Sequence, residues 1–243
     1  MKVLIQKVKG EFSNLNFFQA NKGFEELGYH IEYFDLEQLK GMELHKEAVV
    51  VGGIPVMNLA YDKLGVTRPI VPTYPAELRR YLGRKVELTP LGDIRNRVCF
   101  GNEAIFIKPV DEGRKLFTGH VVAKMRDLIR TAHIPGNTCV WTSAPVSFET
   151  EYRVFIRRGK ILGAKHYRGD FRKIVNFDVV EQAKDLVDGI AIAYCLDFGT
   201  INGFSTLVEA NDSNAMGTYG LHPVDAASMI ADRWNEVVGN PID

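Results

Sequence analysis

Apolar residues in the first part of the chain gather in short runs at residues 2–8, 30–34 and 47–51. Runs of this length and composition predict strands. Between the first two runs, residues 16–27 carry apolar side chains at helical spacing, and Gly28 follows as a helix stop. This alternation of strand and helix predicts a small parallel sheet covered by helices.

The densest group of prolines, at 69–90, places a boundary between folding units at about residues 75–90. Downstream of it, short apolar runs separated by turns predict antiparallel pairing. The expected strands are residues 104–109, 120–124, 138–142, 151–157 and 160–167. The expected helices are residues 75–82, 124–130, 177–187 and 224–238.

The stretch 197–211 is predicted to form a β-hairpin, because two apolar runs flank Asn202-Gly203, a dipeptide typical of tight hairpin turns. A two-residue turn would pair Asp197 with Val208 and put the acids Asp197 and Glu209 on opposite faces. A three-residue loop would instead pair Asp197 with Glu209. We expect the longer loop or a β-bulge, so that the two carboxylates share a face.

Three polar side chains of this hairpin predict a site for a divalent cation. Glu209 and Asn211 are two residues apart, so on a strand they project from the same face. With Asp197 across the hairpin, two carboxylates and one amide oxygen form a hard oxygen cluster that suits Mg²⁺. The alternative is a surface hairpin whose polar residues only face water.

Charge is balanced, with 30 basic and 30 acidic residues and a pI near 7, which argues against nucleic-acid binding as the main task. Three widely spaced cysteines, Cys99, Cys139 and Cys195, favour reduced, buried thiols in a cytoplasmic protein over a disulfide framework. No apolar stretch approaches the length of a membrane span, so we expect a soluble protein with no membrane partner.

Phosphate-binding loops give a weaker signal. Gly52-Gly53 follows a predicted strand and could present backbone N–H groups to an anion, or could form a plain tight turn. The chain has no G-x-x-x-x-G-K-[ST] motif, which excludes a P-loop.

The order of several motifs is more informative than any one of them. A strand ends in Ile107-Lys108-Pro109, a Gly/Lys/Thr loop follows at 111–119, and Glu-Tyr-Arg-Val-Phe lies on a hairpin at 151–155. Asp197 then lies twelve residues before Glu209-Ala210-Asn211. From residue 105 to 220 this order resembles the ATP-grasp family, in which two α+β lobes hold a nucleotide between them. In detail it is similar to a small phage- and bacteria-associated group whose substrate is unassigned.

The resemblance implies an α/β and α+β fold. It comprises an N-terminal Rossmann-like pre-ATP-grasp domain at residues 1–80 and an ATP-grasp domain with antiparallel sheets at 81–243. The lobes of the latter would span residues 81–142 and 143–243. The implied activity is ATP- and Mg²⁺-dependent ligation of a carboxylate to an amine through an acyl phosphate, on an amino acid, peptide or protein terminus. An inactive ATP-binding module and a small-molecule kinase are the alternatives. The substrates and the oligomeric state cannot be read from the sequence.

The resemblance also implies residue roles. Asp197, Glu209 and Asn211 would hold Mg²⁺, and Glu151 would bind the ribose, with Glu149 as the alternative. Lys108 would contact a phosphate of the nucleotide, and the loop at 111–119 would close over the phosphates with Lys115 and Thr118 as ligands. Trp141, Thr142 and Ser143 would form the linker between the lobes and pair with the base through backbone groups.

Arg153 and Lys165 would be the catalytic cations at the transferring phosphoryl group. The alternative for Arg153 is an outward strand charge paired with Glu151. Weaker candidates on the substrate side are Tyr167, Arg168 and Arg172. The chain departs from the family's pattern at Cys195, where well-studied carboxylate–amine ligases carry an arginine two positions before the first metal aspartate.

Overall fold

The structure is a computed structural model that describes residues 1–67, 70–101, 103–110 and 116–242. The chain divides into two compact units. The large unit contains residues 1–79 and 149–243, and the small unit contains residues 80–148. The predicted division of the chain at residues 80 and 142 stays a prediction.

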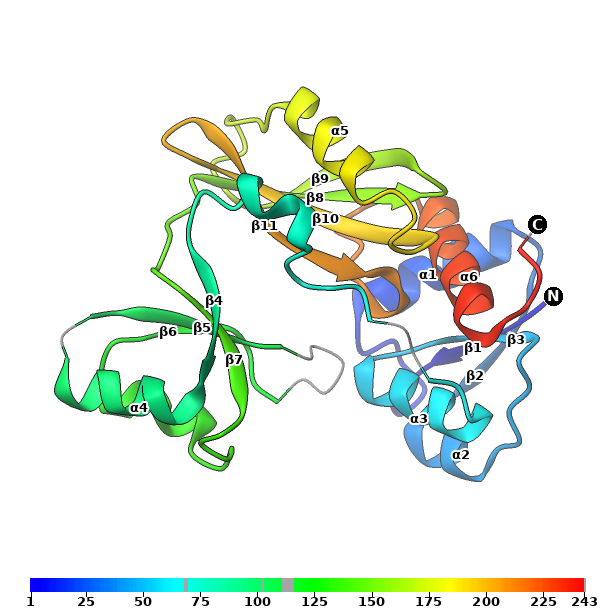
Figure 1. The fold of residues 1–243 in the computed structure, drawn as a ribbon. Coiled ribbons are helices and arrows are strands. Elements are labelled where there is room, and N and C mark those ends of the chain that lie inside the picture. The colour runs from blue at the N-terminus through cyan, green and yellow to red at the C-terminus, as the bar shows by residue number, and fades with distance from the viewer. Residues whose placement is uncertain (68–69, 102, 111–115, 243) are drawn as a thin grey trace. The chain divides into compact units, whose positions relative to one another are not determined.

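The large unit begins with the predicted parallel sheet, which has the strand order β2-β1-β3 (Figure 1). Its strands are β1 (Lys2–Gln6), β2 (His30–Phe34) and β3 (Ala48–Val51). Its helices are α1 (Leu15–Glu26), α2 (Leu36–Gly41) and α3 (Ile54–Leu64). All four residues of β3 are buried, as expected for a strand in a parallel sheet covered by helices.

Two of these helices, α2 and α3, were not predicted. Helix α2 is only six residues long and begins with a capping box between Asp35 and Gln38, a local signal that could have located it. Helix α3 begins directly after Gly52-Gly53, with Gly53 at its N-cap. The Gly53 N–H donates to the Gln6 side chain at 2.9 Å, so the pair forms a tight turn from strand into helix.

The second sheet of the large unit is antiparallel, with the strand order β11-β10-β8-β9. Its strands are β8 (Thr150–Arg157), β9 (Lys160–Gly169), β10 (Ala193–Ile201) and β11 (Phe204–Asp212). The flanking helices are α5 (Phe177–Leu186), the one-turn η3 (Ser213–Ala215) and α6 (Pro223–Val238). Phe155 and Cys195 share one hydrophobic core with Trp234 of α6 and with the parallel sheet, so the two sheets of this unit are packed through α6.

The hairpin of β10 and β11 has the predicted pairing of Asp197 with Glu209. A two-residue turn at Asn202-Gly203, with φ of 50° and 78°, closes it. A register shift after Asp197 then inserts Val208 as an extra residue in β11. The predicted β-bulge is therefore confirmed, and the alternative of a three-residue loop is wrong.

The small unit is an antiparallel sheet with the strand order β4-β7-β5-β6. Its strands are β4 (Val86–Pro90), β5 (Ile105–Pro109), β6 (His120–Val122) and β7 (Cys139–Ser143). Helix α4 (Leu91–Phe100) and the 3-10 helix η2 (Met125–Thr131) supply Leu91, Ile94 and Leu128 to the core of this unit. Neither β4 nor α4 was predicted from the sequence. Pro90 is the last residue of β4 and the N-cap residue of α4. The helix predicted at residues 75–82 is the 3-10 helix η1 (Ala76–Tyr81).

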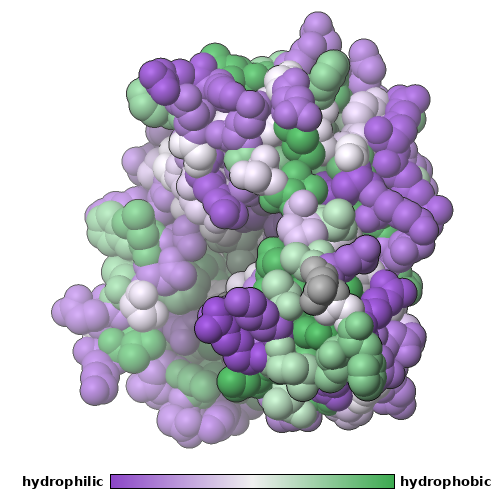
Figure 2. Space-filling view, turned by 90° about the vertical axis from the view of Figure 1, so that its left-hand side faces the viewer, coloured by the Kyte–Doolittle hydropathy of each residue, from purple (hydrophilic) through white to green (hydrophobic). Residues whose placement is uncertain are grey.

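Polar and charged side chains cover much of the face drawn in Figure 2, with hydrophobic groups between them. Among the residues that the structure describes, no helix combines the length and apolar character needed to cross a membrane.

The hairpin turn gives a first prediction. Gly203→Ala should lower the free energy of unfolding by about 1 kcal/mol or more, because the left-handed backbone is unfavourable for any residue with a Cβ. Open space surrounds the position, so a steric clash does not contribute. Urea unfolding followed by circular dichroism measures the change.

Gly41→Ala is the matched control, because its Cβ also meets open space but its backbone is helical. That variant should be as stable as the wild type or more stable by up to about 1 kcal/mol. Equal unfolding curves for the two variants would contradict the role assigned to the turn.

Candidate active site

Four predicted residues form one row across the antiparallel sheet of the large unit. Glu209 lies opposite Asp197, Asp197 lies opposite Arg153, and Arg153 lies opposite Lys165. Directly opposed residues of antiparallel strands project from the same face. The sheet therefore brings two acids and two cations together from four strands.

Arg153 and Asp197 form the central contact of this row. The Arg153 Nε and Nη2 atoms donate to Asp197 Oδ1 and Oδ2 at 2.8 and 2.7 Å, a bidentate pair. Their side chains are only 8% and 2% exposed. Burial alone would lower the pKa of Arg153, but the charge and hydrogen bonds of Asp197 outweigh it and raise this pKa well above its usual value. The alternative pairing of Arg153 with Glu151 is therefore wrong.

The three predicted metal ligands converge. Asn211 Nδ2 lies 3.3 Å from Asp197 Oδ2 and 3.2 Å from Glu209 Oε1. A half-turn of the Asn211 amide would place its oxygen where the nitrogen now lies, beside both carboxylates. By donor type this set fits Mg²⁺. Within the described ranges, no group of three or more His, Cys, Asp and Glu side chains is arranged to hold a metal ion.

Glu151 lies on the same face as the row and binds two side chains of β9. Tyr167 donates its hydroxyl to Glu151 Oε2 at 2.8 Å and lies 3.4 Å from Asp197 Oδ2. Arg168 Nη1 lies 3.3 Å from Glu151 Oε1. Burial, followed by the charges of Asp197 and Glu151, raises the pKa of Tyr167, so its hydroxyl stays protonated and acts as a donor.

The alternative ribose ligand, Glu149, lies elsewhere. It pairs with Lys173 and accepts hydrogen bonds from the Thr200 hydroxyl and the Gly203 N–H, both at 3.1 Å. The hydrogen bond from Lys173 is the main cause of the lowered pKa of this carboxyl. These contacts stabilise the turn between β10 and β11, so Glu149 is not part of the row. Arg172, a weaker substrate candidate, pairs with Asp170 at 2.9 Å on the surface.

Lys165 differs from Arg153 in having no side-chain partner within the described ranges of the chain. Its ammonium makes no hydrogen bond or ion pair with any residue in the part of the chain that the structure describes. The row thus offers one cation that is bound to Asp197 and one that is available to an external anion.

Cys195 is the residue at which the chain departs from the pattern that the sequence resemblance predicts, which has an arginine at this position. It lies on β10 two residues before Asp197, is fully buried, and contacts Met216 Sδ at 3.6 Å through its sulfur. Burial raises the pKa of this thiol to about 12. All three cysteines are free, but the expectation that all are buried is wrong, since Cys99 and Cys139 are exposed.

In the small unit, Lys108 and Trp141 lie directly opposite each other on one face of the sheet. Leu88 pairs with Trp141 on the same face and is 53% exposed. Thr142 is the next residue on β7 and faces the other way, where its hydroxyl lies 2.9 Å from that of Thr89. The predicted nucleotide residues Trp141 and Thr142 therefore lie on opposite faces of the sheet.

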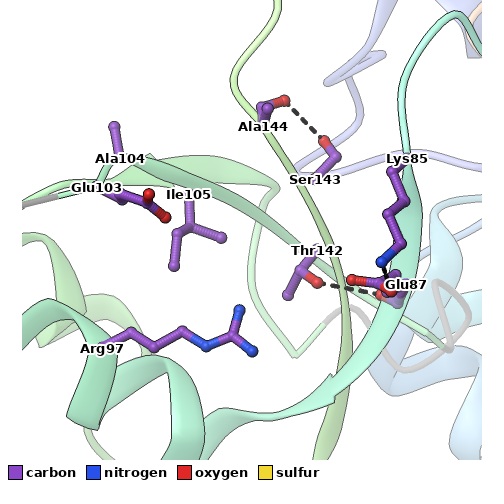
Figure 3. Close-up of a pocket in the computed structure, with 9 residues that line it drawn as sticks. All are labelled: Lys85, Glu87, Arg97, Glu103, Ala104, Ile105, Thr142, Ser143 and Ala144. Atoms are coloured by element: carbon purple, nitrogen blue, oxygen red, sulfur yellow. Dashed lines mark hydrogen bonds and ion pairs between the residues drawn. The ribbon is translucent and has the colours of Figure 1, made fainter. Parts of the chain in front are cut away.

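A cavity of about 400 Å³ opens where β7 ends and β4 and β5 begin, beside α4 (Figure 3). Its lining residues are Lys85, Glu87, Arg97, Glu103, Ala104, Ile105, Thr142, Ser143 and Ala144. Thr142 and Ser143 are the predicted site residues that contribute to it. Two cations and two carboxylates offset each other in the lining, so the cavity has no strong charge preference.

The loop predicted to close over the phosphates is described in part. Lys115 lies outside the described residues. Thr118 is exposed, and its carbonyl lies 2.8 Å from His120 Nδ1. A Cβ at Gly119 would lie 3.0 Å from the Phe106 ring, so this glycine allows the loop to pass close to β5.

Sequence reasoning did not single out Tyr219. Its ring stacks on Tyr167 with centroids 4.8 Å apart, and the Arg153 guanidinium carbon lies 5.1 Å from its centroid. The only local signal is the dipeptide Tyr219-Gly220, which forms a turn with positive φ at both residues.

Comparisons with known proteins bear on this arrangement. A family model described as "ATP-grasp domain, R2K clade family 2" matches residues 81–229, more than half of the chain. A search of curated proteins gives no match.

Several solved structures are similar over nearly the whole chain. A D-alanine–D-alanine ligase from Bacillus anthracis complexed with ATP has 14% identity, a TM-score of 0.57 and coverage of 98% of each chain. A RimK domain ATP-grasp protein from Sphaerobacter thermophilus DSM 20745 has 13% identity and a TM-score of 0.53, over 95% of this chain and 98% of that chain. The macrocyclase MdnC from Microcystis aeruginosa MRC, bound with precursor peptide MdnA, has 11% identity and a TM-score of 0.53, over 95% and 99%. This likeness confirms the predicted mixed α/β fold of the ATP-grasp type with antiparallel sheets, whereas the Rossmann-like character of the N-terminal domain stays a prediction.

The burial of the cysteines gives a second prediction. In the native protein at pH 8, two thiols should react rapidly with Ellman's reagent and the third only after unfolding in guanidinium, because the thiolate is the reactive form and Cys195 is buried with a pKa of about 12. Cys195→Ala should lose the slow thiol alone. Three fast thiols in the wild type would contradict the placement of Cys195.

Proposed function

The chain belongs to family 2 of the R2K clade of ATP-grasp domains, and on that premise we propose that it is a ligase that uses ATP and Mg²⁺ to join a carboxylate to an amine. The row of Glu209, Asp197, Arg153 and Lys165 is the observation that carries the proposal. Ligands for a divalent cation and two side-chain cations lie side by side in it. Transfer of a phosphoryl group between anions requires such a concentration of positive charge.

The proposed reaction has two steps. An oxygen of the substrate carboxylate attacks the γ-phosphorus of ATP, the bond to the β-phosphate oxygen breaks, and ADP leaves. The amine nitrogen then attacks the carbonyl carbon of the acyl phosphate, inorganic phosphate leaves, and the nitrogen loses a proton. Mg²⁺ held by Asp197, Glu209 and Asn211 would neutralise the phosphate oxygens.

Lys165 is the residue that we assign to the transferring phosphoryl group. It is the cation of the row without a committed partner among the described residues, and it lies opposite Arg153. Arg153 serves the same chemistry only when its guanidinium leaves Asp197. Together the two side chains would supply the positive charge that an arginine provides in the well-studied ligases and that Cys195 does not provide here.

For the nucleotide, we propose that the small unit contributes the face that carries Lys108 and Trp141. An indole beside exposed Leu88 offers an apolar surface for the base, and the lysine offers a charge for a phosphate. Lys115 and Thr118 would close over the phosphates, and Glu151 of the large unit would bind the ribose. Thr142 and Ser143 would contribute backbone groups beside the base.

The substrate is proposed to be an amino acid, a peptide or a protein terminus. A D-alanine–D-alanine ligase and a peptide-bound macrocyclase share this fold, which supports that range. We place the activity in the cytoplasm, because the three cysteines are free and two of them are exposed. Replacement of an arginine by Cys195 favours one competing function, an ATP-binding module without turnover, whereas the converging oxygen cluster favours the ligase.

A third prediction tests turnover. Glu209→Gln and Asn211→Ala should each lower ADP release more than about 100-fold, because each removes a hard oxygen ligand near the transferring phosphate. ADP release is measured over a panel of carboxylates and amines, with mass spectrometry of the products and hydroxylamine trapping of the acyl phosphate. Glu26→Gln, at an exposed position on α1, is the control and should retain wild-type activity. Full activity in both cluster variants would remove the metal assignment.

A fourth prediction distinguishes the two faces of the small sheet. Trp141→Ala and Lys108→Met should each weaken ATP binding about tenfold or more, since both lie on the proposed nucleotide face. Thr142→Val, on the opposite face, should bind ATP as the wild type does. Isothermal titration with ATP measures all three. Weaker binding in Thr142→Val alone would instead place the base in the cavity of Figure 3.

A further inference from the structure

Tyr219 is held in an unusual backbone conformation for an aromatic residue. Its φ is 45°, and Gly220 follows with a φ of 82°. The Leu221 N–H donates to the Thr218 carbonyl at 2.8 Å, which closes a tight turn. Asn, Asp and Gly are the residues that suit the first position of such a turn, so a tyrosine there needs a compensating contact.

The compensating contacts lie at the centre of the proposed active site. The Tyr219 ring stacks on Tyr167 at an interplanar angle of 17°, and the Arg153 guanidinium lies over its face. Arg153 Nη1 also donates to the Gly217 carbonyl at 3.4 Å. A Cβ at Gly217 would lie 3.1 Å from the Tyr219 ring, so glycine lets the ring lie flat against the loop. The turn thus encloses the side of the guanidinium that faces away from Asp197.

The turn is fixed to the N-terminal part of the large unit. Both the N–H and the hydroxyl of Thr218 donate to Asn16 Oδ1, at 2.9 and 2.8 Å. Gln19 Nε2 donates to the Leu221 carbonyl. These bonds hold the turn on α1, so Tyr219 can stay in place when Arg153 changes partner.

Arg153 and a divalent cation need the same oxygens. The guanidinium donates to both oxygens of Asp197, and Asp197 Oδ2 also has Asn211 and Tyr167 as neighbours at 3.3 and 3.4 Å. Each oxygen of Asp197 already accepts a hydrogen bond from the guanidinium, so an ion that coordinates either oxygen shares it with Arg153. Repulsion between the two positive charges then weakens the Arg153 pair.

We propose that Tyr219 is a positioning residue that retains Arg153 on Asp197 until a divalent cation displaces it. The displaced guanidinium then remains over the Tyr219 ring, beside the row, where an anionic oxygen of the substrate can accept its hydrogen bonds. The ring is 46% exposed, which leaves room for that exchange. This inference rests on the proposed function, because it takes Asp197 as a ligand of the cation.

Mn²⁺ binding tests the competition without any need for turnover. Free Mn²⁺ is quantified by electron paramagnetic resonance, with the full chain and no nucleotide. Arg153→Gln should raise the Mn²⁺ affinity more than about tenfold, because it removes the competing charge. Tyr219→Ala should raise it about two- to fivefold, because a cation–π contact of modest strength is lost. A merely structural loss at Tyr219 would lower the affinity instead.

Tyr219→Phe is the matched control, since it keeps the ring and should bind Mn²⁺ within about twofold of the wild type. Glu209→Gln identifies the site, since it should weaken Mn²⁺ binding in every background. Tyr219→Ala with unchanged or weaker binding, while Glu209→Gln still weakens it, would overturn the role of Tyr219 alone. An Arg153→Gln variant that binds no Mn²⁺ would overturn the cation site together with the competition.

Discussion

The bidentate pair of Arg153 and Asp197 is the interaction on which the arrangement of the large unit's polar face depends. Both side chains are nearly excluded from water, and burying two charges costs several kcal/mol per ion unless their hydrogen bonds are satisfied. Here the carboxylate has Arg153, Asn211 and Tyr167 within hydrogen-bonding distance, and the guanidinium also donates to the Gly217 carbonyl. The pair is therefore stable only while the strands and the loop that supply these partners stay in register.

That register is a property of the backbone. A slip of one residue in a strand moves every side chain to the other face. With the two-residue turn at Asn202-Gly203, regular pairing would direct Glu209 away from Asp197, and the bulge at Val208 corrects the phase. Beyond the bulge, Cys195 and Phe155 continue the same face into the hydrophobic core. The polar row thus adjoins residues of the same face that are packed into the hydrophobic core, and this packing fixes its position.

The sequence predicted most of this arrangement where the signals are local. The hairpin follows from Asn202-Gly203, and the pairing of Asp197 with Glu209 follows from the chemistry that two carboxylates on one face would serve. Helices α2 and α4 were missed because each begins within two residues of the end of a strand, so the apolar patterns of strand and helix run into each other. The pairing of Arg153 with Asp197 could not be predicted from the sequence. The two residues are 44 positions apart, and they meet only because β8 lies next to β10 in the sheet. The same holds for Tyr219, whose partners lie on β8 and β9.

Cys195 changes how charge is balanced in the proposed reaction. Without an arginine at that position, the acids Glu151, Asp197 and Glu209 face two cations, Arg153 and Lys165, on the same surface of the sheet. Arg168 adds a third positive charge, but its side chain is 76% exposed and therefore screened by water. A surface with this balance has no excess positive charge for a triphosphate. On the proposed function, the divalent cation supplies that excess, and because it does so by taking Asp197, its arrival also frees the guanidinium of Arg153. One binding event would then provide two cations to the reacting oxygens, which is how a site that lacks the usual arginine could retain the chemistry of a carboxylate–amine ligase.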